Sequence, residues 1–314
     1  MLKVGLVGVG GISGAHIPAW LNLEHVELVA ICDIRPKQME KYQNIKKYTD
    51  FDEMLENEQL DILDICLPTY LHADFSVKAM KKGINVICEK PISLKREDVK
   101  LIYETAEKNN VKFMVAQVLR FWKEYEYVKR IYDSRKYGRL LSGSMTRLGS
   151  YPAWSWDDWM MDEKRSGLVP FDLHIHDLDF MVYAFGTPKK FTSFRAKEAD
   201  QDFINAIYEF EDFFISSEAS WYASPYPFTA KFHFQFENAI IANEGQGLKI
   251  YERGGNVISL DEIQAGDTGE INLPKSDAYA NEIAYFVDCV KNNCIPDKVK
   301  SSELESVMDI LSNL

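Results

Sequence analysis

Short apolar runs alternate with segments of helical periodicity along the first third of the chain. The runs span residues 4–7, 26–31, 62–67, 84–88 and 113–116. They are nearly continuous in Val, Ile and Leu, as expected where helices cover both faces of a parallel sheet. Alternation of this kind is typical of βαβ units. The pattern therefore predicts an α/β domain with a doubly wound parallel sheet over residues 1–118.

A different pattern follows Arg120. Charged and amphipathic helices are expected over residues 123–135 and 172–185, with an apolar run at 140–147 between them. Strand candidates rich in Phe, Tyr, Ile and Thr come next, at residues 203–210, 213–221, 229–236 and 239–243. Amphipathic helices at 278–291 and 302–311 close the chain. We expect an α+β domain over residues 119–314, with a large, mostly antiparallel open sheet and C-terminal helices.

The composition fits a globular protein of two domains and argues against several kinds of partner. The 314 residues exceed what one hydrophobic core usually organises. A net charge of −12 disfavours nucleic acid and anionic membrane surfaces. No apolar run reaches transmembrane length and the start has no signal-peptide pattern, so we expect a cytoplasmic protein. Five cysteines without CxxC or Cys/His spacing favour free thiols over a metal site.

A glycine-rich segment, Gly8-Val9-Gly10-Gly11-Ile12-Ser13-Gly14, follows the first apolar run and opens a helix-compatible stretch. In that context a GxGxxG-like segment predicts a Rossmann dinucleotide site. The first glycine would allow the tight turn, and the second would let the backbone approach a pyrophosphate. The third position of the motif carries a serine, which is still small. We predict cofactor contacts from Gly8, Gly10, Gly11, Ile12 and Ser13.

An acidic residue ends the second apolar run. Asp33 lies a little over twenty residues past the glycines, where a carboxylate binds the ribose hydroxyls of NAD and repels the 2′-phosphate of NADP. Arg35 weakens this preference, because its guanidinium could hold that phosphate or lie over the adenine. We expect NAD as the cofactor, with NADP as the alternative.

Two further strand ends carry polar side chains. Pro68, Thr69 and His72 follow one apolar run, and Glu89 and Lys90 follow the next. Ligands of open α/β sheets bind at the carboxyl ends of the strands, so these residues are expected to border the same crevice as the glycine segment. The alternative is ordinary turn chemistry, in which Pro and Thr end a strand.

Three segments together resemble one family. Glu89-Lys90-Pro91 matches an EKP motif, Pro68 to His72 resembles a PxxxH segment, and Asp172 to Asp179 resembles the DxGxHxxD segment of the glucose-fructose oxidoreductase and inositol dehydrogenase (Gfo/Idh/MocA) family. The resemblance covers nearly the whole chain. It implies that Lys90, Asp172 and His176 are catalytic. It also implies that Gln117 and Arg120 lie near the nicotinamide and the substrate. His174 departs from the family pattern, which often has Gly or Thr there.

Hydride transfer between a secondary alcohol and nicotinamide requires a proton to leave or join the same oxygen. Either Lys90 exchanges this proton, or His176 does so while a cationic Lys90 stabilises the alkoxide. Burial and a nearby nicotinamide charge would favour the neutral amine of Lys90, and Glu89 would favour the ammonium. Asp172 and His176 are spaced i, i+4, so on an α-helix the carboxylate could orient the imidazole. A capping Asp172 and a structural His176 are the alternative.

Aromatic residues add two expectations about recognition. Trp154, Trp156 and Trp159 follow Tyr151-Pro152, and Trp159 in particular is a candidate to stack on a sugar or polyol ring. Packing in a core or an interface explains such residues equally well. The Phe-rich strands predict a large sheet with an apolar face, which favours a homo-oligomer formed through that sheet.

These observations predict an NAD(P)-dependent oxidoreductase that acts on a secondary alcohol or carbonyl of a sugar, inositol or related polyol. Two alternatives keep the same scaffold. One is a non-catalytic NAD-binding regulator. The other is an enzyme that retains its NAD and uses it for glycoside cleavage or epimerisation, since a shared fold does not fix the reaction.

Overall fold

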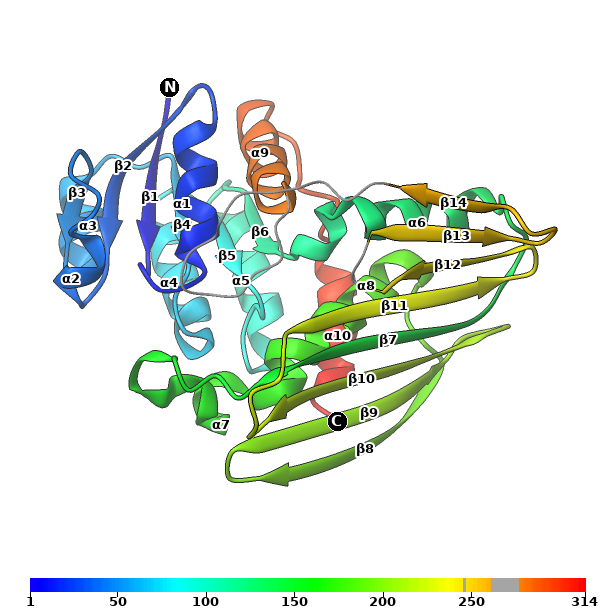
Figure 1. Ribbon diagram of the computed structural model, residues 1–314. Coiled ribbons are helices and arrows are strands. Elements are labelled where there is room, and N and C mark those ends of the chain that lie inside the picture. The colour runs from blue at the N-terminus through cyan, green and yellow to red at the C-terminus, as the bar shows by residue number, and fades with distance from the viewer. Residues whose placement is uncertain (245–246, 261–276) are drawn as a thin grey trace. The chain divides into compact units, whose positions relative to one another are not determined.

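The computed structural model describes residues 1–244, 247–260 and 277–314 (Figure 1). They divide into two compact units. The first comprises residues 1–118 together with 277–301, and the second comprises the remainder of the described chain. Each unit is described below by itself.

The first unit contains a sheet of six parallel strands in the order β3-β2-β1-β4-β5-β6 (Figure 1). This confirms the predicted doubly wound α/β sheet. The edge strand β3 lies outside the predicted runs because its sequence, Lys-Lys-Tyr, is polar. The strands are β1 (Leu2–Val7), β2 (Val26–Cys32), β3 (Lys46–Tyr48), β4 (Ile62–Ile65), β5 (Asn85–Glu89) and β6 (Phe113–Ala116).

Helices with apolar faces accompany this sheet. Helix α3 has a side-chain cap, since it begins where the side chain of Asp50 accepts a hydrogen bond from the backbone N–H of Glu53 at 2.9 Å. The helices are α1 (Ser13–Asn22), α2 (Pro36–Met39), α3 (Phe51–Asn57), α4 (His72–Lys81), α5 (Arg96–Lys108) and α9 (Ala278–Lys291).

The position of α9 corrects one part of the predicted domain division. Residues 277–301 group with the first unit, although the sequence pattern placed them in the second domain. Ile283, Phe286 and Val287 of α9 are buried, and α9 packs against α1. The sequence does not show that the chain goes back to the first unit after the second sheet, because an amphipathic helix can cover either domain.

The second unit contains a sheet of eight strands in the order β14-β13-β12-β11-β7-β10-β9-β8 (Figure 1). Strands β7 and β10 run parallel and the other neighbours pair antiparallel, which confirms the predicted mostly antiparallel sheet. The strands are β7 (Leu140–Ser150), β8 (Lys190–Glu198), β9 (Gln201–Glu209), β10 (Phe214–Tyr222), β11 (Thr229–Phe236), β12 (Ala239–Asn243), β13 (Leu248–Glu252) and β14 (Val257–Leu260).

One face of this sheet packs against helices. Tyr125 of α6 contacts the ring of Phe180 in α8 and the ring of Phe232 in β11, with ring centroids 4.8 and 5.0 Å apart. Buried and exposed residues alternate along β11, as expected for a sheet covered on one side. The helices of the second unit are α6 (Lys123–Ser134), α7 (Glu163–Ser166), α8 (Ile175–Phe185) and α10 (Ser301–Leu311).

None of the helices among the described residues has the length and apolar character needed to cross a membrane.

Candidate functional site

The turn after β1 requires glycine at its first position. Gly8 has a φ of +92°, and a Cβ there would lie 2.4 Å from the carbonyl oxygen of Cys66. Ser13 occupies the third position of the motif, where it is buried and donates a hydrogen bond from Oγ to the carbonyl of Gly10 at 2.6 Å. The serine therefore closes the turn at the start of α1 rather than disrupting it.

The carboxylate of Asp33 lies at the end of β2 and fixes the same turn. It accepts hydrogen bonds from the backbone N–H groups of Val9 and Arg35, both at 2.8 Å. The guanidinium of Arg35 also pairs with it, at 3.1 Å from Nε and 3.2 Å from Nη2. The two residues predicted to compete over cofactor preference thus form one ion pair.

The geometry of this turn suits a dinucleotide. A Cβ on Gly10 would meet only the tip of Arg35 within 4 Å, which leaves space over the backbone beside the N-terminus of α1. At the end of β6, the side-chain nitrogen of Gln117 is buried and has no hydrogen-bond acceptor among the described residues. A pyrophosphate over Gly10, ribose hydroxyls at Asp33 and an acceptor for Gln117 would satisfy these features.

His72 opens α4 and is buried, with 1% of its surface exposed. Its Nε2 lies 2.7 Å from the carbonyl oxygen of Leu67, and its Nδ1 lies 2.7 Å from that of Pro91. Thr69 of the same segment is also buried. The side chain of His72 holds two backbone segments together, so we assign it a structural role instead of the predicted cofactor contact.

Lys90 follows directly on β5. The carboxylate of Glu89, the last residue of that strand, accepts a hydrogen bond from the backbone N–H of Lys90 at 3.1 Å. Glu89 is buried and Lys90 is partly exposed. The sheet therefore presents the lysine at its carboxyl edge, on which the glycine turn also lies.

A buried cluster beneath Glu89 was not predicted. His16 of α1 lies with Nδ1 2.8 Å from Asp64 and Nε2 2.9 Å from Glu89. The indole Nε1 of Trp20 donates to Asp64 at 2.6 Å. Burial alone lowers the pKa of His16, but the charges of Asp64 and Cys66 and the hydrogen bonds to them together outweigh this effect and raise the pKa well above its ordinary value. The available signal was Asp64 itself, a carboxylate inside an apolar strand that needs a buried partner.

In the second unit, Asp172 does not lie on a regular α-helix. Residues Pro170–His174 form a π-helical turn, in which the backbone N–H of Ile175 reaches the carbonyl of Pro170, and α8 with His176 starts only after it. Asp172 thus lies on a π-helical turn instead of the expected regular α-helix, and its alignment with His176 stays a prediction. Single π-helical turns of this kind are frequent at functional sites.

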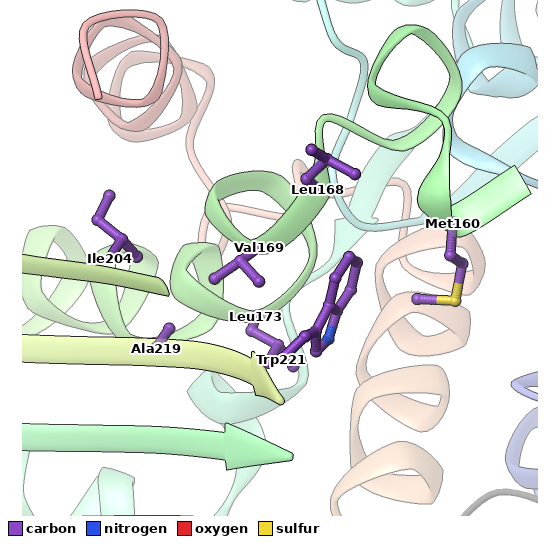
Figure 2. Packing of buried hydrophobic residues seen from close by; sticks show 7 residues of the cluster. All are labelled: Met160, Leu168, Val169, Leu173, Ile204, Ala219 and Trp221. Carbon is purple, nitrogen blue, oxygen red and sulfur yellow. The ribbon is translucent and has the colours of Figure 1, made fainter. Parts of the chain in front are cut away.

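The backbone entering this turn is strained at Leu168 and tightly held. Gly167 and the buried Leu168 have φ values of +74° and +59°. The hydroxyl of Ser166 accepts a hydrogen bond from the N–H of Leu168 at 2.9 Å, and Asp202 accepts one from Val169 at 3.1 Å. Leu168 and Val169 pack with Leu173, Met160 and Trp221 in an apolar cluster (Figure 2). Such strain persists where the surroundings fix the chain, as at binding and catalytic sites.

The histidine that departs from the family pattern faces the interior of this unit. His174 is fully buried, and its Nε2 lies 2.6 Å from the hydroxyl of Tyr208 in β9. Burial, and then the charge of Arg147, lower the pKa of His174 to about 3. His174 is therefore a neutral core residue, and in this unit it does not present a surface to a ligand.

Arg120 is held by two carboxylates inside the second unit. Its side chain has 0% exposure, and Nε and Nη2 donate to the carboxylate of Asp179 at 2.8 and 2.6 Å. Glu303 of α10 also bonds to it. The predicted contact of Arg120 with a substrate has no support in this geometry. We assign the residue a structural role, in which Asp179 of the family-like segment is its partner.

The tryptophans divide into two groups. Trp159 is partly buried and packs against the apolar cluster of Figure 2, so its contacts are those of a core residue. Trp154 and Trp156 are more exposed, at 60% and 39%. If this loop has an aromatic platform for a sugar, these two residues fit that role better than the predicted Trp159.

Two family profiles match this chain. Residues 2–117 match the profile described as "Oxidoreductase family, NAD-binding Rossmann fold", and residues 125–242 match the one described as "GFO/IDH/MocA C-terminal domain". The chain belongs to the Gfo/Idh/MocA family. The glycine turn, Asp33 and Lys90 lie in the first matched segment, and Asp172 and His176 lie in the second.

Curated relatives of this Gfo/Idh/MocA protein include sugar and inositol dehydrogenases. Glucose-6-phosphate 3-dehydrogenase of Bacillus subtilis (strain 168) is 28% identical over 207 residues, which are 63% of this chain and 57% of the relative. Inositol 2-dehydrogenase of Salmonella typhimurium is 28% identical over 189 residues, 57% of this chain and 53% of the relative. The chain spans about half the length of the curated relatives it matches.

Solved structures share the fold over nearly all of the chain. An oxidoreductase from Agrobacterium radiobacter, in complex with NAD+, L-tartaric acid and magnesium, has a TM-score of 0.85 at 17% identity, covering 99% of this chain and 94% of that one. A levoglucosan dehydrogenase in complex with NADH and levoglucosan has a TM-score of 0.83 at 18% identity, covering 99% and 95%. At these identities the likeness establishes the fold.

Proposed function

We propose that this Gfo/Idh/MocA protein is an NAD-dependent oxidoreductase that acts on a secondary alcohol or carbonyl of a sugar, inositol or related polyol. The observation that carries the proposal is the position of Lys90. It follows directly on β5, in the same unit as a glycine turn that suits a pyrophosphate and an acidic residue that suits a ribose. A lysine at that edge can exchange a proton with a substrate oxygen.

The first unit supplies the residues that would hold the cofactor. The backbone of Gly8 to Ser13 would bind the pyrophosphate at the N-terminus of α1, and Asp33 would bind the adenosine ribose. The bound cofactor would offer a hydrogen-bond acceptor to the buried amide nitrogen of Gln117. When bound, the nicotinamide supplies the hydride acceptor or donor for oxidation or reduction of the CH–OH group.

The residues of this chain would manage the accompanying proton. In one assignment the neutral amine of Lys90 takes the proton from the substrate hydroxyl as the C–H bond breaks. In the other, the imidazole of His176 takes it while the ammonium of Lys90 stabilises the alkoxide. Asp172 would then orient His176 from the π-helical turn.

The relatives define which substrates to test first. Glucose-6-phosphate 3-dehydrogenase, inositol 2-dehydrogenase and levoglucosan dehydrogenase all act, by their names, on ring-shaped polyhydroxylated molecules. We propose that the substrate here belongs to that class. The exposed Trp154 and Trp156 would offer stacking faces to such a ring.

We also propose that the protein forms a homo-oligomer through the large sheet. Apolar side chains are exposed on five of its strands, and they include Phe194, Ile207, Phe214, Ile240 and Tyr251. Exposed apolar side chains gathered on one sheet favour association. Light scattering tests the proposal: a monomeric mass across the working concentration range would contradict it.

Purified protein, NAD+ and a panel of sugars, sugar phosphates and inositols test the main proposal. We expect reduction of NAD+ with at least one member, and loss of that activity in Lys90→Met. A protein that binds NADH but turns over none of the panel would instead fit a regulatory role. NAD that stays bound through purification and is neither reduced nor oxidised overall would fit glycoside cleavage or epimerisation.

A further inference from the structure

Two buried histidines join the carboxyl ends of β4 and β5 in the first unit. His16 links Asp64 of β4 to Glu89 of β5, through contacts of 2.8 and 2.9 Å. His72 links the carbonyl of Leu67, just after β4, to that of Pro91, just after β5. The residues held from the β5 side are therefore the two neighbours of Lys90 in the sequence.

His16 forms a charged link. Both of its ring nitrogens face carboxylates, and only an imidazolium can donate to two acceptors at once. The raised pKa of His16, which results from Asp64 and Cys66 against the opposing effect of burial, agrees with that state. The groups that face the ring are Asp64, Glu89, Cys66 and, from α9, Tyr279, whose ring centroid is 5.9 Å away.

His72 forms a link between backbone segments. Both of its acceptors are carbonyl oxygens, so two donated hydrogen bonds again require the imidazolium. Burial lowers the pKa of His72, and the hydrogen bonds to Pro91 and Leu67 offset this only in part. The charged groups that act on it are Glu89 and Lys90. A neutral ring can satisfy one carbonyl at a time, so acid strengthens this link.

A structural need alone does not explain these links. A buried ion pair is weak grounds for stability, because removing charges from water costs about as much as the pairing returns. Precise placement of a reacting group is a different requirement, since an error of ~1 Å can cost ~10²-fold in rate. Lysine has a long flexible side chain, so its backbone is the part that neighbouring contacts can fix.

We propose that His16 and His72 are positioning residues for Lys90: they hold Glu89 and Pro91 on either side of it and so set where its amine meets the substrate. This inference rests on the proposed catalytic role of Lys90. Neither histidine touches the substrate in this account. The effect reaches the amine through the backbone, and in the case of Glu89 also through its carboxylate.

Steady-state kinetics of four variants provide the first test. His16→Phe and His72→Phe remove all donors and keep a ring of similar size, whereas His16→Gln and His72→Gln keep one donating amide. We expect kcat to fall by ~10²-fold in the Phe variants and by less in the Gln variants, with the Kd for NADH changed less than threefold. Melting curves of all variants identify any that fail to fold, and in that case the Gln variants carry the test.

Trp20→Phe is the matched control. It deletes the hydrogen bond from Nε1 to Asp64 and so loosens the same cluster without changing a contact to Glu89 or Lys90. We expect a lower melting temperature with kcat close to that of the original protein. If Trp20→Phe and the His16 variants lose kcat in proportion to their loss of stability, the links are structural and the inference is wrong.

A readout that needs neither cofactor nor turnover separates this inference from the proposed function. Acylation of the apo protein at a series of pH values, followed by mass spectrometry, measures the reactivity of Lys90 against the exposed Lys82. We expect the pH profile of Lys90 labelling to shift in the histidine variants and to stay fixed in Trp20→Phe. Unchanged profiles would overturn the inference, whereas an active Lys90→Met enzyme would overturn the proposed function.

A bound cation is the alternative explanation for the cluster around His16. The ligand-type atoms of His16, Asp64 and Cys66 lie within 4.8 Å of one another, a spacing that would also admit a metal ion. Metal analysis and treatment with EDTA decide between the two. Full activity and an unchanged melting temperature after EDTA support the hydrogen-bonded links. One equivalent of bound metal, whose removal abolishes the activity and lowers the melting temperature, would contradict them.

Discussion

The carboxylate of Asp33 accepts a hydrogen bond from the backbone N–H of Val9 at 2.8 Å. The residue expected to bind the cofactor ribose is thus also an anchor of the glycine turn that precedes α1. Its second oxygen accepts from the N–H of Arg35. Cofactor preference and the shape of the turn therefore depend on the same side chain.

Asp33→Asn should change cofactor preference while leaving the turn in place. The amide oxygen can still accept from Val9, but the charge that repels a 2′-phosphate is gone. We expect the ratio of the Kd values for NADPH and NADH to fall by at least ~10-fold, equivalent to ~1.4 kcal/mol. Fluorescence titration with both cofactors measures the ratio. An unchanged ratio would show that Asp33 does not discriminate between them.

Gly8 and Gly10 should respond differently to alanine. In Gly8→Ala the Cβ would meet the backbone of Cys66 at 2.4 Å and the φ of +92° is unfavourable, so we expect a large loss of stability. In Gly10→Ala the Cβ would make only an ordinary contact with the tip of Arg35, at 3.8 Å, so the fold should keep its melting temperature. NADH binding to Gly10→Ala should nevertheless weaken by ~10-fold or more, because the methyl group blocks the pyrophosphate. Tight binding by this variant would place the pyrophosphate elsewhere.

The pair of Arg120 and Asp179 should be important for stability. Asp179→Asn removes one of the two negative charges that neutralise the buried guanidinium of Arg120. We expect the unfolding free energy to fall by about 3 kcal/mol. Urea unfolding measures the change. The substitution Arg139→Gln removes an exposed ion pair of the same unit and should cost less than ~1 kcal/mol. If Asp179→Asn kept full stability but raised KM alone, a substrate-binding role for Arg120 would return.

His174 should make the second unit sensitive to acid. Its pKa is lowered from 6.5 to about 3 in the folded protein, so between these values the unfolded chain binds a proton that the folded one does not. Its contribution to stability is therefore complete above pH ~6.5 and is lost as the pH falls toward ~3, by up to ~1.4 kcal/mol per pH unit.

Urea unfolding between neutral and acidic pH tests this prediction. His174→Phe should flatten the pH dependence relative to the original protein. Tyr208→Phe removes the same hydrogen bond but keeps the titrating ring, so it should retain the slope. Equal slopes in His174→Phe and the original protein would mean that other groups cause the acid sensitivity.

The sequence predicted the fold best where apolar periodicity was strong. The strands from β1 to β6, other than β3, and those from β9 to β12 were found within a few residues of their bounds. Strand β8 was missed because its residues are mostly exposed and polar, so no apolar alternation marks it. The return of α9 to the first unit was also missed, since it depends on tertiary packing.

The candidate site was predictable as a set of residues but not as a set of contacts. The glycine turn, Asp33 and Lys90 follow from strand-end positions, and Asp172 and His176 follow from the family resemblance. The π-helical turn at Asp172 could not be anticipated, because it depends on how Leu168 and Val169 pack. The role of His16 likewise depends on Asp64 and Glu89, which are 48 and 73 residues away in the sequence.

The most direct test of the account is the rate at which Lys90→Met reduces NAD+ with the best substrate found in the sugar and inositol panel. Met keeps the length of the side chain and removes its amine. The account predicts a kcat lower by ~10²–10⁴-fold, the range expected for loss of a proton-transfer group, with unaltered melting temperature and NADH binding. A Lys90→Met enzyme as active as the original would contradict the central claim.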